Sequence, residues 1–129
     1  MQPAPILVVE DDEAIRRYAV AVLEDAGYDV LPARDAAEAF VHLEANPSIG
    51  LMFTDVVMPR IDGLMLADMA RLRRPGLRVL YATGYFDTVQ RQPGYRYGAT
   101  LTKPYARGEL EAAVRQSLSE PPLLHVPGR

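Results

Sequence analysis

Residues 5–13 read Pro-Ile-Leu-Val-Val-Glu-Asp-Asp-Glu, a short apolar run that ends abruptly in four acidic residues. A β-branched run of this length is typical of a strand buried in a parallel sheet. The acids stand where a helix would begin, and negative charge is favoured at a helix N-terminus. Gly27 stands where a glycine commonly ends a helix. The side chains expected on the inward face of this helix are Ile15, Tyr18, Ala19, Val22 and Leu23.

The same alternation of a short apolar run and a helical pattern occurs five times along the chain. The expected strands cover residues 5–9, 28–33, 49–54, 78–83 and 99–102. The expected helices include residues 64–73, which should bury Leu66, Met69, Ala70 and Leu72, a weakly patterned segment at 86–98, and residues 107–118. Five such units predict an α/β fold, a doubly wound five-stranded parallel sheet with helices on both faces.

The composition narrows the range of functions. The 129 residues suffice for one domain, which we expect to span residues 1–119 with a flexible tail at 120–129. A net charge of −3 gives no general reason to bind nucleic acid, and the absence of cysteine excludes disulfides and thiolate chemistry. No apolar run reaches the roughly 18 residues of a membrane span, and the start lacks the basic region of a signal peptide. We therefore expect a cytoplasmic protein without a nucleic-acid or membrane partner.

Polar residues stand at four of the predicted strand ends. Glu10 and Asp11 follow the first strand, Asp55 the third, Thr83 closes the fourth and Lys103 follows the fifth. In a doubly wound parallel sheet these ends share one edge, and ligands bind there. Clustered carboxylates repel one another, and a hard divalent cation such as Mg²⁺ relieves the repulsion. Lys103 is also the only lysine among the 14 basic residues.

Each of these residues also has a purely structural explanation. An acidic run can serve a helix dipole, an aspartate after a strand can form a turn, and threonine has a high β-propensity. A lysine before a proline is commonly exposed to solvent. Together these explanations require independent coincidences at four strand ends, so a common site is favoured.

Four motifs then carry a resemblance to a known family. They are Val8-Val9-Glu10-Asp11-Asp12, Asp55-Val56-Val57-Met58-Pro59 with Asp62-Gly63, Ala82-Thr83-Gly84, and Lys103-Pro104. In this order and spacing, over residues 6–118, the chain resembles the receiver domain of bacterial two-component response regulators. The resemblance implies the flavodoxin-like, CheY-like form of the fold. The segment from Ala82 to Tyr85 resembles a subgroup that includes single-domain regulators and hybrid kinases.

The resemblance also implies a role for each acidic residue. Asp55 would accept a phosphoryl group from a sensor histidine kinase or a histidine phosphotransfer protein. Mg²⁺ would be held by Asp55, Asp11 and the main-chain carbonyl of Val57, with Glu10 acting through water. The domain would promote its own phosphorylation and dephosphorylation without being a conventional turnover enzyme.

Three more positions follow from the same resemblance. Thr83 would bind a phosphoryl oxygen and report phosphorylation, Lys103 would pair with Asp55 and then with the phosphoryl group, and Pro104 would hold the turn after a cis peptide bond. One position departs from the family pattern, because Thr100 stands where many receivers carry an aromatic switch residue. We hypothesise that Tyr85 takes over this switch role.

Several alternatives stay open beside this interpretation. The chain could be the receiver module of a hybrid histidine kinase, a phosphate sink, or a pseudo-receiver that is not phosphorylated. An aspartyl-phosphate phosphohydrolase is disfavoured because it needs a second acid where Val57 stands, and the acids after the first strand disfavour a nucleotide binder. Output is expected through contact with an effector protein, and homodimerisation is left open. The tyrosines expected on the contact face are Tyr85, Tyr95, Tyr97 and Tyr105.

Overall fold

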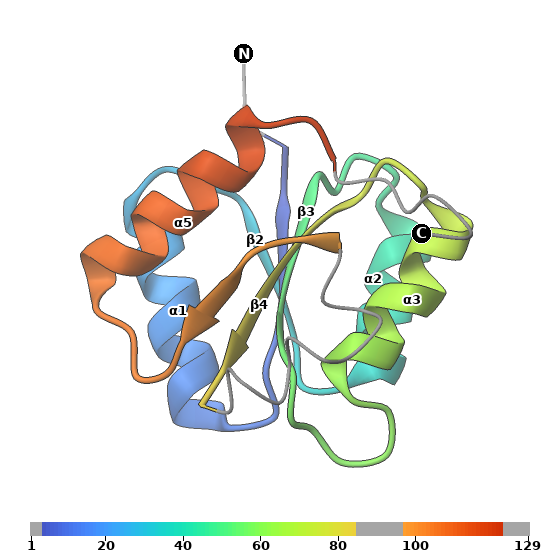
Figure 1. Cartoon of the computed structure of the whole chain (residues 1–129), viewed down its shortest axis with the longest axis horizontal. Coiled ribbons are helices and arrows are strands. Elements are labelled where there is room, and N and C mark those ends of the chain that lie inside the picture. Colours follow the sequence, from blue (N-terminus) through green and yellow to red (C-terminus); the bar gives the residue numbers. More distant parts are fainter. Residues whose placement is uncertain (1–3, 85–96, 123–129) are drawn as a thin grey trace.

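The computed structural model of the chain describes residues 4–84 and 97–122 (Figure 1). Its strands are β1 (Ile6–Val9), β2 (Val30–Ala33), β3 (Leu51–Asp55), β4 (Arg78–Thr83) and β5 (Thr100–Thr102). Its helices are α1 (Glu13–Asp25), α2 (Ala36–Ala45), α3 (Gly63–Arg73) and α5 (Arg107–Ser119). None of the helices in these ranges is long and apolar enough to cross a membrane. Tyr85 and all but the last two residues of the expected helix at 86–98 lie outside the described ranges.

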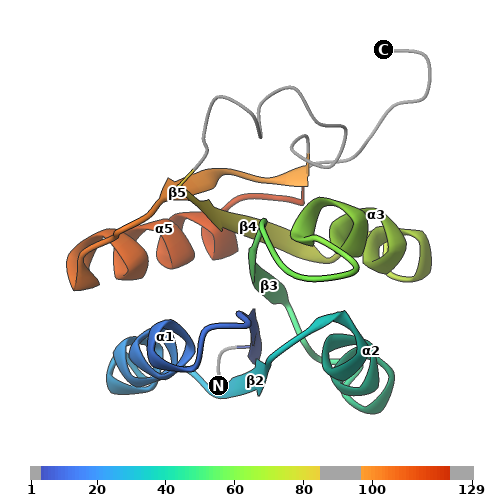
Figure 2. The ribbon, with the colours of Figure 1, turned by 90° about the horizontal axis from the view of Figure 1, so that it is seen from below.

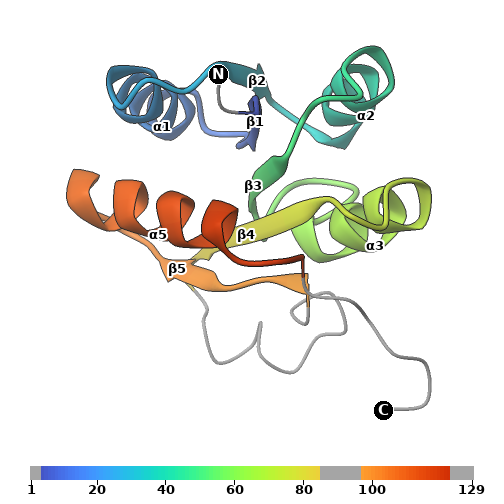
Figure 3. The ribbon, with the colours of Figure 1, turned by 90° about the horizontal axis from the view of Figure 1, so that it is seen from above.

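The strands form one parallel sheet in the order β2-β1-β3-β4-β5. Seen along its edge, the sheet is covered by α1 and α5 on one face and by α2 and α3 on the other (Figures 2 and 3). The chain builds outward from β1 in one direction to β2 and in the other to β3, so the order reverses between β1 and β3. This arrangement confirms the predicted doubly wound, flavodoxin-like fold and puts the switch point, where ligands bind, between those two strands.

Burial of the sheet on both faces explains the unbroken apolar runs of the central strands. Along β1, Ile6 and Val8 pack in the core under α1 and α5, whereas Leu7 and Val9 pack in the core under α2 and α3. All four side chains are at most 1% exposed. Full burial of a side chain of this size contributes about 1.5–3 kcal/mol, so β1 anchors both layers of the domain.

Aspartates begin three of the described helices. The side chains of Asp12, Asp35 and Asp62 each accept a hydrogen bond of 2.8–2.9 Å from a main-chain N–H group in the first turn of α1, α2 and α3. Such bonds satisfy donors that a helix leaves unpaired at its start. Asp12, in the acidic run after β1, therefore caps α1, whereas Glu10 and Asp11 have carboxylate oxygens close to that of Asp55 at the strand ends.

Helix α3 turns a different face to the sheet from the predicted one. Its buried residues are Gly63, Leu64, Leu66, Ala67, Ala70 and Arg71. The predictions that Leu72 and Met69 are buried were wrong, since they are 84% and 37% exposed. A helix turns about 100° per residue, so Leu72 lies on nearly the opposite side from Ala70. Arg71 takes an inward place instead, with its guanidinium 4.8 Å from the ring centre of Tyr97.

Two tyrosines also differ from expectation. Tyr18, predicted on the inward face of α1, is 42% exposed, and its ring centre lies 6.1 Å from that of Tyr105. Tyr97, predicted at a contact face, is only 8% exposed because it packs against Arg71. Tyr97 is therefore part of the core rather than of an outer surface.

The arginines around the end of α3 make contacts within the fold. Arg73 pairs with Glu44 at 3.1 Å, and Arg74 donates to two carbonyl groups of the segment after α2 at 2.6 and 2.7 Å. Arg78 donates to the carbonyl just after α5 at 2.8 Å, and Arg71 is buried. These contacts show that the arginines around the end of α3 join neighbouring elements of the fold.

Candidate functional site

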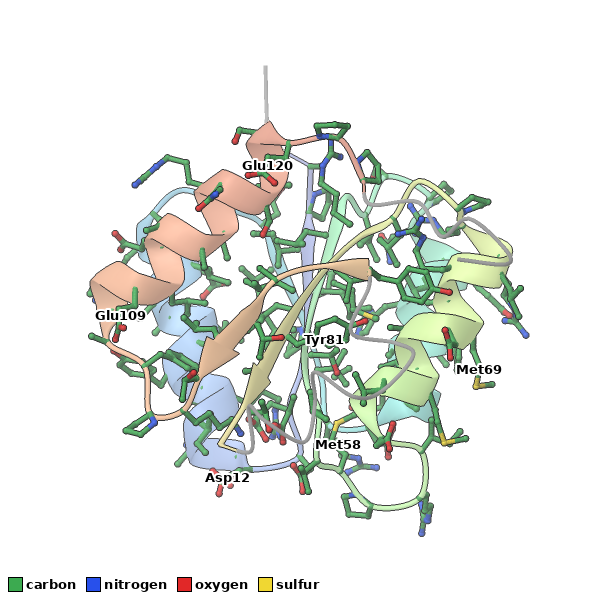
Figure 4. All side chains as sticks on the ribbon, in the orientation of Figure 1. Asp12, Met58, Met69, Tyr81, Glu109 and Glu120 are labelled. Atoms are coloured by element: carbon green, nitrogen blue, oxygen red, sulfur yellow. The ribbon has the colours of Figure 1, made fainter. Side chains whose placement is uncertain are left out.

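The strand ends bring the predicted polar residues together at the lower edge of the sheet in Figure 1. Glu10, Asp55 and Thr83 are buried there, with 4%, 7% and 1% of their surface exposed, whereas Asp11 is exposed. Asp12 and Met58, labelled in Figure 4, mark the loops that leave this edge. The sequence prediction of one common site is therefore consistent with the fold.

Main-chain hydrogen bonds between neighbouring strands fix where these side chains begin. The N–H of Glu10 donates to Ala33 of β2 at 3.0 Å, and the N–H of Lys103 donates to Thr83 of β4 at 2.9 Å. The N–H of Val56, directly after Asp55, donates to β4 at 3.0 Å. The sheet thus extends its ladder up to the site residues, which places their side chains on rigid backbone.

Lys103 joins the two buried acids. Its Nζ lies 2.6 Å from Oε1 of Glu10 and 3.1 Å from Oδ1 of Asp55. The peptide bond between Lys103 and Pro104 is cis. An ammonium is a compact charge that can donate several hydrogen bonds at once. A single lysine after β5 therefore pairs with both carboxylates, although β4 and β3 separate β5 from β1 in the sheet.

Burial is the main cause of the raised pKa values of Glu10 and Asp55. Burial raises the pKa of Glu10 to about 7, although its hydrogen bonds to Lys103 and to the N–H of Asp12 oppose the rise. Burial also raises the pKa of Asp55, against the opposing charge of Lys103. Repulsion between the carboxylates, which the sequence suggested as the cause, makes a smaller contribution. Burial alone would lower the pKa of Lys103, but its bonds to Glu10 and Asp55 outweigh that effect and raise it.

The acids have the chemistry of a site for a hard divalent cation. One carboxylate oxygen each from Glu10, Asp11 and Asp55 lies within 4.8 Å of the others. Mg²⁺ prefers oxygen ligands and often binds through a few carboxylates with water completing its shell. Two of the three acids are buried, so the cost of their charge is one that a bound cation would reduce. The donor set fits Mg²⁺ and offers no soft ligand that would favour zinc or copper.

A hollow opens beside the acids. It is lined by Asp55, Val57, Thr83, Gly84 and Lys103. Apart from its chain neighbours, no described residue has an atom within 4 Å of the place where a Cβ atom of Gly84 would stand. The hollow gives a ligand access to a carboxylate, a hydroxyl and an ammonium at once. Pro104 lies just outside it, in a neighbouring groove with Tyr18 and Tyr105.

Gly63 packs against the main chain that carries Asp55, for a reason that the sequence did not reveal. A Cβ atom there would lie 2.1 Å from the main-chain oxygen of Asp55. The N–H of Gly63 also donates to the carbonyl of Val56 at 2.8 Å. The first residue of α3 therefore packs directly on the strand end that carries Asp55. The motif Asp62-Gly63 signalled a turn, but only the fold shows which backbone the glycine approaches.

Comparison with known proteins gives a consistent picture. A family model described as the response regulator receiver domain matches residues 6–115. The chain is 36% identical to the response regulator receiver protein CpdR of Brucella abortus over 116 residues, which cover 88% of this chain and 95% of CpdR. It is 35% identical to the response regulator Rre1 of Synechocystis over 123 residues, which cover 92% of this chain and 53% of Rre1.

A solved structure agrees with these matches. The receiver domain from the hybrid histidine kinase CckA is similar with a TM-score of 0.74 and 36% sequence identity, over 88% of this chain and 98% of that domain. The chain therefore spans nearly all of CpdR and of this isolated domain, but only about half of Rre1.

Proposed function

Because the chain belongs to the response regulator receiver domain family, we propose that Asp55 accepts a phosphoryl group from a histidine kinase or a histidine phosphotransfer protein. The observation that carries the proposal is the placement of Asp55 between a lysine and two further acids. Lys103 lies 3.1 Å from its carboxylate, and Glu10 and Asp11 share its edge of the sheet. A buried carboxylate with a cation on one side and a cation site on the other is suited to phosphoryl transfer.

Asp55 would act as the nucleophile. One of its carboxylate oxygens forms a bond to phosphorus while the bond from phosphorus to the donor breaks. The attacking form is the ionised carboxylate, and burial alone would favour the protonated one. The ion pair with Lys103 opposes that effect and so favours the reactive, ionised form of Asp55.

Glu10, Asp11, Asp55 and the main-chain carbonyl of Val57 would hold Mg²⁺. When bound, the metal would neutralise the acids and stabilise the negative charge on the transferring group. Because both oxygens of Glu10 already accept hydrogen bonds, from Lys103 and from the N–H of Asp12, a contact through water suits this residue. Asp11 is exposed and can meet the metal directly.

Thr83 and Lys103 would bind the phosphoryl oxygens. Both line the hollow that Asp55 faces, Thr83 from the end of β4 and Lys103 from the loop after β5. A hydroxyl and an ammonium are hydrogen-bond donors for an anionic group. The new phosphoryl group would draw Lys103 away from Glu10 and Asp55. Phosphorylation would therefore change the contacts at the strand ends.

The proposed role is that of a signalling module in the cytoplasm rather than a turnover enzyme. It would receive the phosphoryl group, promote its hydrolysis and contact an effector protein. A second candidate role is that of a receiver module within a hybrid histidine kinase, which the similarity to the CckA receiver domain favours. Asp55, Thr83 and Lys103 together argue against a pseudo-receiver, which would lack the means to accept phosphate.

Intact-mass spectrometry after incubation with Mg²⁺ and acetyl phosphate tests the proposal. We expect one added phosphoryl group on the wild-type protein and none on the Asp55→Asn variant. Asp29→Asn is the matched control, because it makes the same chemical change at an exposed residue before β2. No addition to the wild type, and no spectral response near Asp55 to beryllofluoride with Mg²⁺, would instead favour the pseudo-receiver.

A further inference from the structure

The main chain of Glu10 has an unusual partner. Its N–H is paired with β2 at 3.0 Å, but β2 ends at Ala33 and the chain leaves the sheet to cap α2 with Asp35. In a parallel ladder, the carbonyl of Glu10 would accept its next hydrogen bond from an amide of the continuing strand. Arg16 supplies that bond instead, because its Nη1 lies 2.9 Å from the carbonyl oxygen of Glu10.

This contact closes a short loop around the acids. Arg16 belongs to α1, and its own N–H donates to the carbonyl of Asp12 at 2.9 Å, so its backbone is fixed by the helix. Its guanidinium then reaches back to the residue that ends β1. Asp11 lies inside the loop closed in this way. A buried carbonyl needs a partner, so the turn that carries Glu10 and Asp11 is held by the side chain of Arg16.

The side chain of Glu10 is held independently of this contact. Its Oε2 accepts from the N–H of Asp12 at 3.1 Å, and its Oε1 accepts from Lys103 at 2.6 Å. The carboxylate is thus oriented from one side, and the main chain from the other. Loss of the Arg16 contact would release the main chain of the turn while leaving the Glu10–Lys103 pair in place.

We propose that Arg16 is a positioning residue for the metal-binding acids, fixing the turn so that Glu10 and Asp11 present their carboxylates together. The inference rests on the proposed function for the identity of the cation. Its geometric basis is the bond between Arg16 and the carbonyl of Glu10. Among the described residues, Arg16 does not line the hollow beside Asp55, and its hydrogen bond goes to the main-chain carbonyl of Glu10 rather than to a carboxylate.

Arg17 provides a matched control. It follows Arg16 in the same helix and carries the same charge, but its side chain is 78% exposed and pairs with Glu13 at 2.9 Å. Replacing either arginine by alanine removes one positive charge near the acids. By Coulomb's law that loss alone would strengthen Mg²⁺ binding. Loss of positioning would weaken it, so the sign of the change separates the two effects.

Isothermal titration of the metal-free protein with MgCl₂ measures this sign. Removing groups that orient metal ligands typically lowers metal affinity 10- to 100-fold. We expect Arg16→Ala to raise the dissociation constant at least about 10-fold, and Arg17→Ala to leave it unchanged or lower it slightly. Arg16→Lys keeps the charge and one donor, so its affinity should fall between those of the wild type and Arg16→Ala.

A second readout needs no metal. In ¹⁵N–¹H NMR spectra of the metal-free protein, the amide of Asp12 reports on the turn because it donates to Glu10. We expect this resonance to move in Arg16→Ala and not in Arg17→Ala.

Equal or tighter Mg²⁺ binding by Arg16→Ala would overturn the inference, as would equal weakening in Arg17→Ala. If Arg16→Ala does not fold, wild-type affinity in Arg17→Ala with weakened binding in Arg16→Lys still supports it, and wild-type affinity in Arg16→Lys overturns it. Failure of the wild type to bind Mg²⁺ would identify the proposed function as the faulty step.

Discussion

Replacement of two glycines by alanine should have opposite effects on this domain. At Gly63 a Cβ atom would meet three main-chain atoms, the closest being the oxygen of Asp55 at 2.1 Å. At Gly108, in the first turn of α5, no described residue has an atom within 4 Å of the same position, apart from the chain neighbours and the helix's own backbone. The two variants make the same chemical change, so any difference between them reports the packing of α3 on the end of β3.

The contact at Gly63 sets the size of the effect. Ordinary contact begins near 3.4 Å, so α3 or the end of β3 must move by about 1 Å to admit the new methyl group. Overpacking of this kind costs about 1–3 kcal/mol. At roughly 4 °C per kcal/mol for a domain of this size, Gly63→Ala should lower the melting temperature by about 4–12 °C. Gly108→Ala should raise stability by up to about 1 kcal/mol, because alanine is the better helix former.

The same displacement should affect phosphorylation. A shift of about 1 Å at a reacting group can cost about 100-fold in rate. Gly63 packs on the main chain of Asp55, whose carboxylate is the proposed nucleophile. Thermal unfolding followed by circular dichroism gives the stability of both variants, and the rate of phosphorylation by acetyl phosphate at fixed Mg²⁺ gives the second effect. The reasoning would be refuted if Gly63→Ala were as stable and as readily phosphorylated as Gly108→Ala.

Two further predictions concern charge and packing. The folded-state pKa of Glu10 is raised from 4.5 to about 7, so its ionisation penalises the metal-free fold: the penalty is absent below pH 4.5, grows as the pH rises and is complete above pH 7. This penalty amounts to at most about 3 kcal/mol. Urea unfolding with EDTA at pH 5 to 8 should therefore show the wild type losing stability as the pH rises, and Glu10→Gln should give a flatter profile. Identical profiles would contradict the assignment of the raised pKa to Glu10. On α3, Leu66→Ala should cost about 2–5 kcal/mol because Leu66 is fully buried, whereas Leu72→Ala should change stability by less than about 0.5 kcal/mol. Equal costs in urea unfolding would show that α3 faces the sheet differently.

The sequence was most informative where one physical cause dominates. The apolar run of β1 has no alternative to burial on both faces, and the parallel order of the strands then brings Asp55, Thr83 and Lys103 to one edge. The face of α3 was less predictable, because its apolar residues surround the helix and Arg71 can stack on Tyr97 as readily as leucine can pack. Pattern alone gave no reason to prefer Arg71 over Leu72 at an inward place.

The family resemblance implied the pair between Lys103 and Asp55, but other contacts between distant residues could not be read from the sequence. The 2.6 Å bond of Lys103 to Glu10 joins residues 93 positions apart, and its existence depends on the length of both side chains as well as on the sheet. The bond from Arg16 to a main-chain carbonyl depends on where β2 ends, which no local motif specifies. The hypothesis that Tyr85 is a switch residue stays a prediction, since this residue lies outside the described ranges.

The central claim is that Asp55 is the residue that carries the phosphoryl group. Its most direct test is to phosphorylate the wild-type protein with acetyl phosphate and Mg²⁺, reduce the acyl phosphate with borohydride, and sequence the digested peptides by mass spectrometry. Reduction converts an aspartyl phosphate into homoserine, and we expect homoserine at position 55 alone. Reduction products at Glu10 or Asp11 in place of Asp55 would contradict the claim.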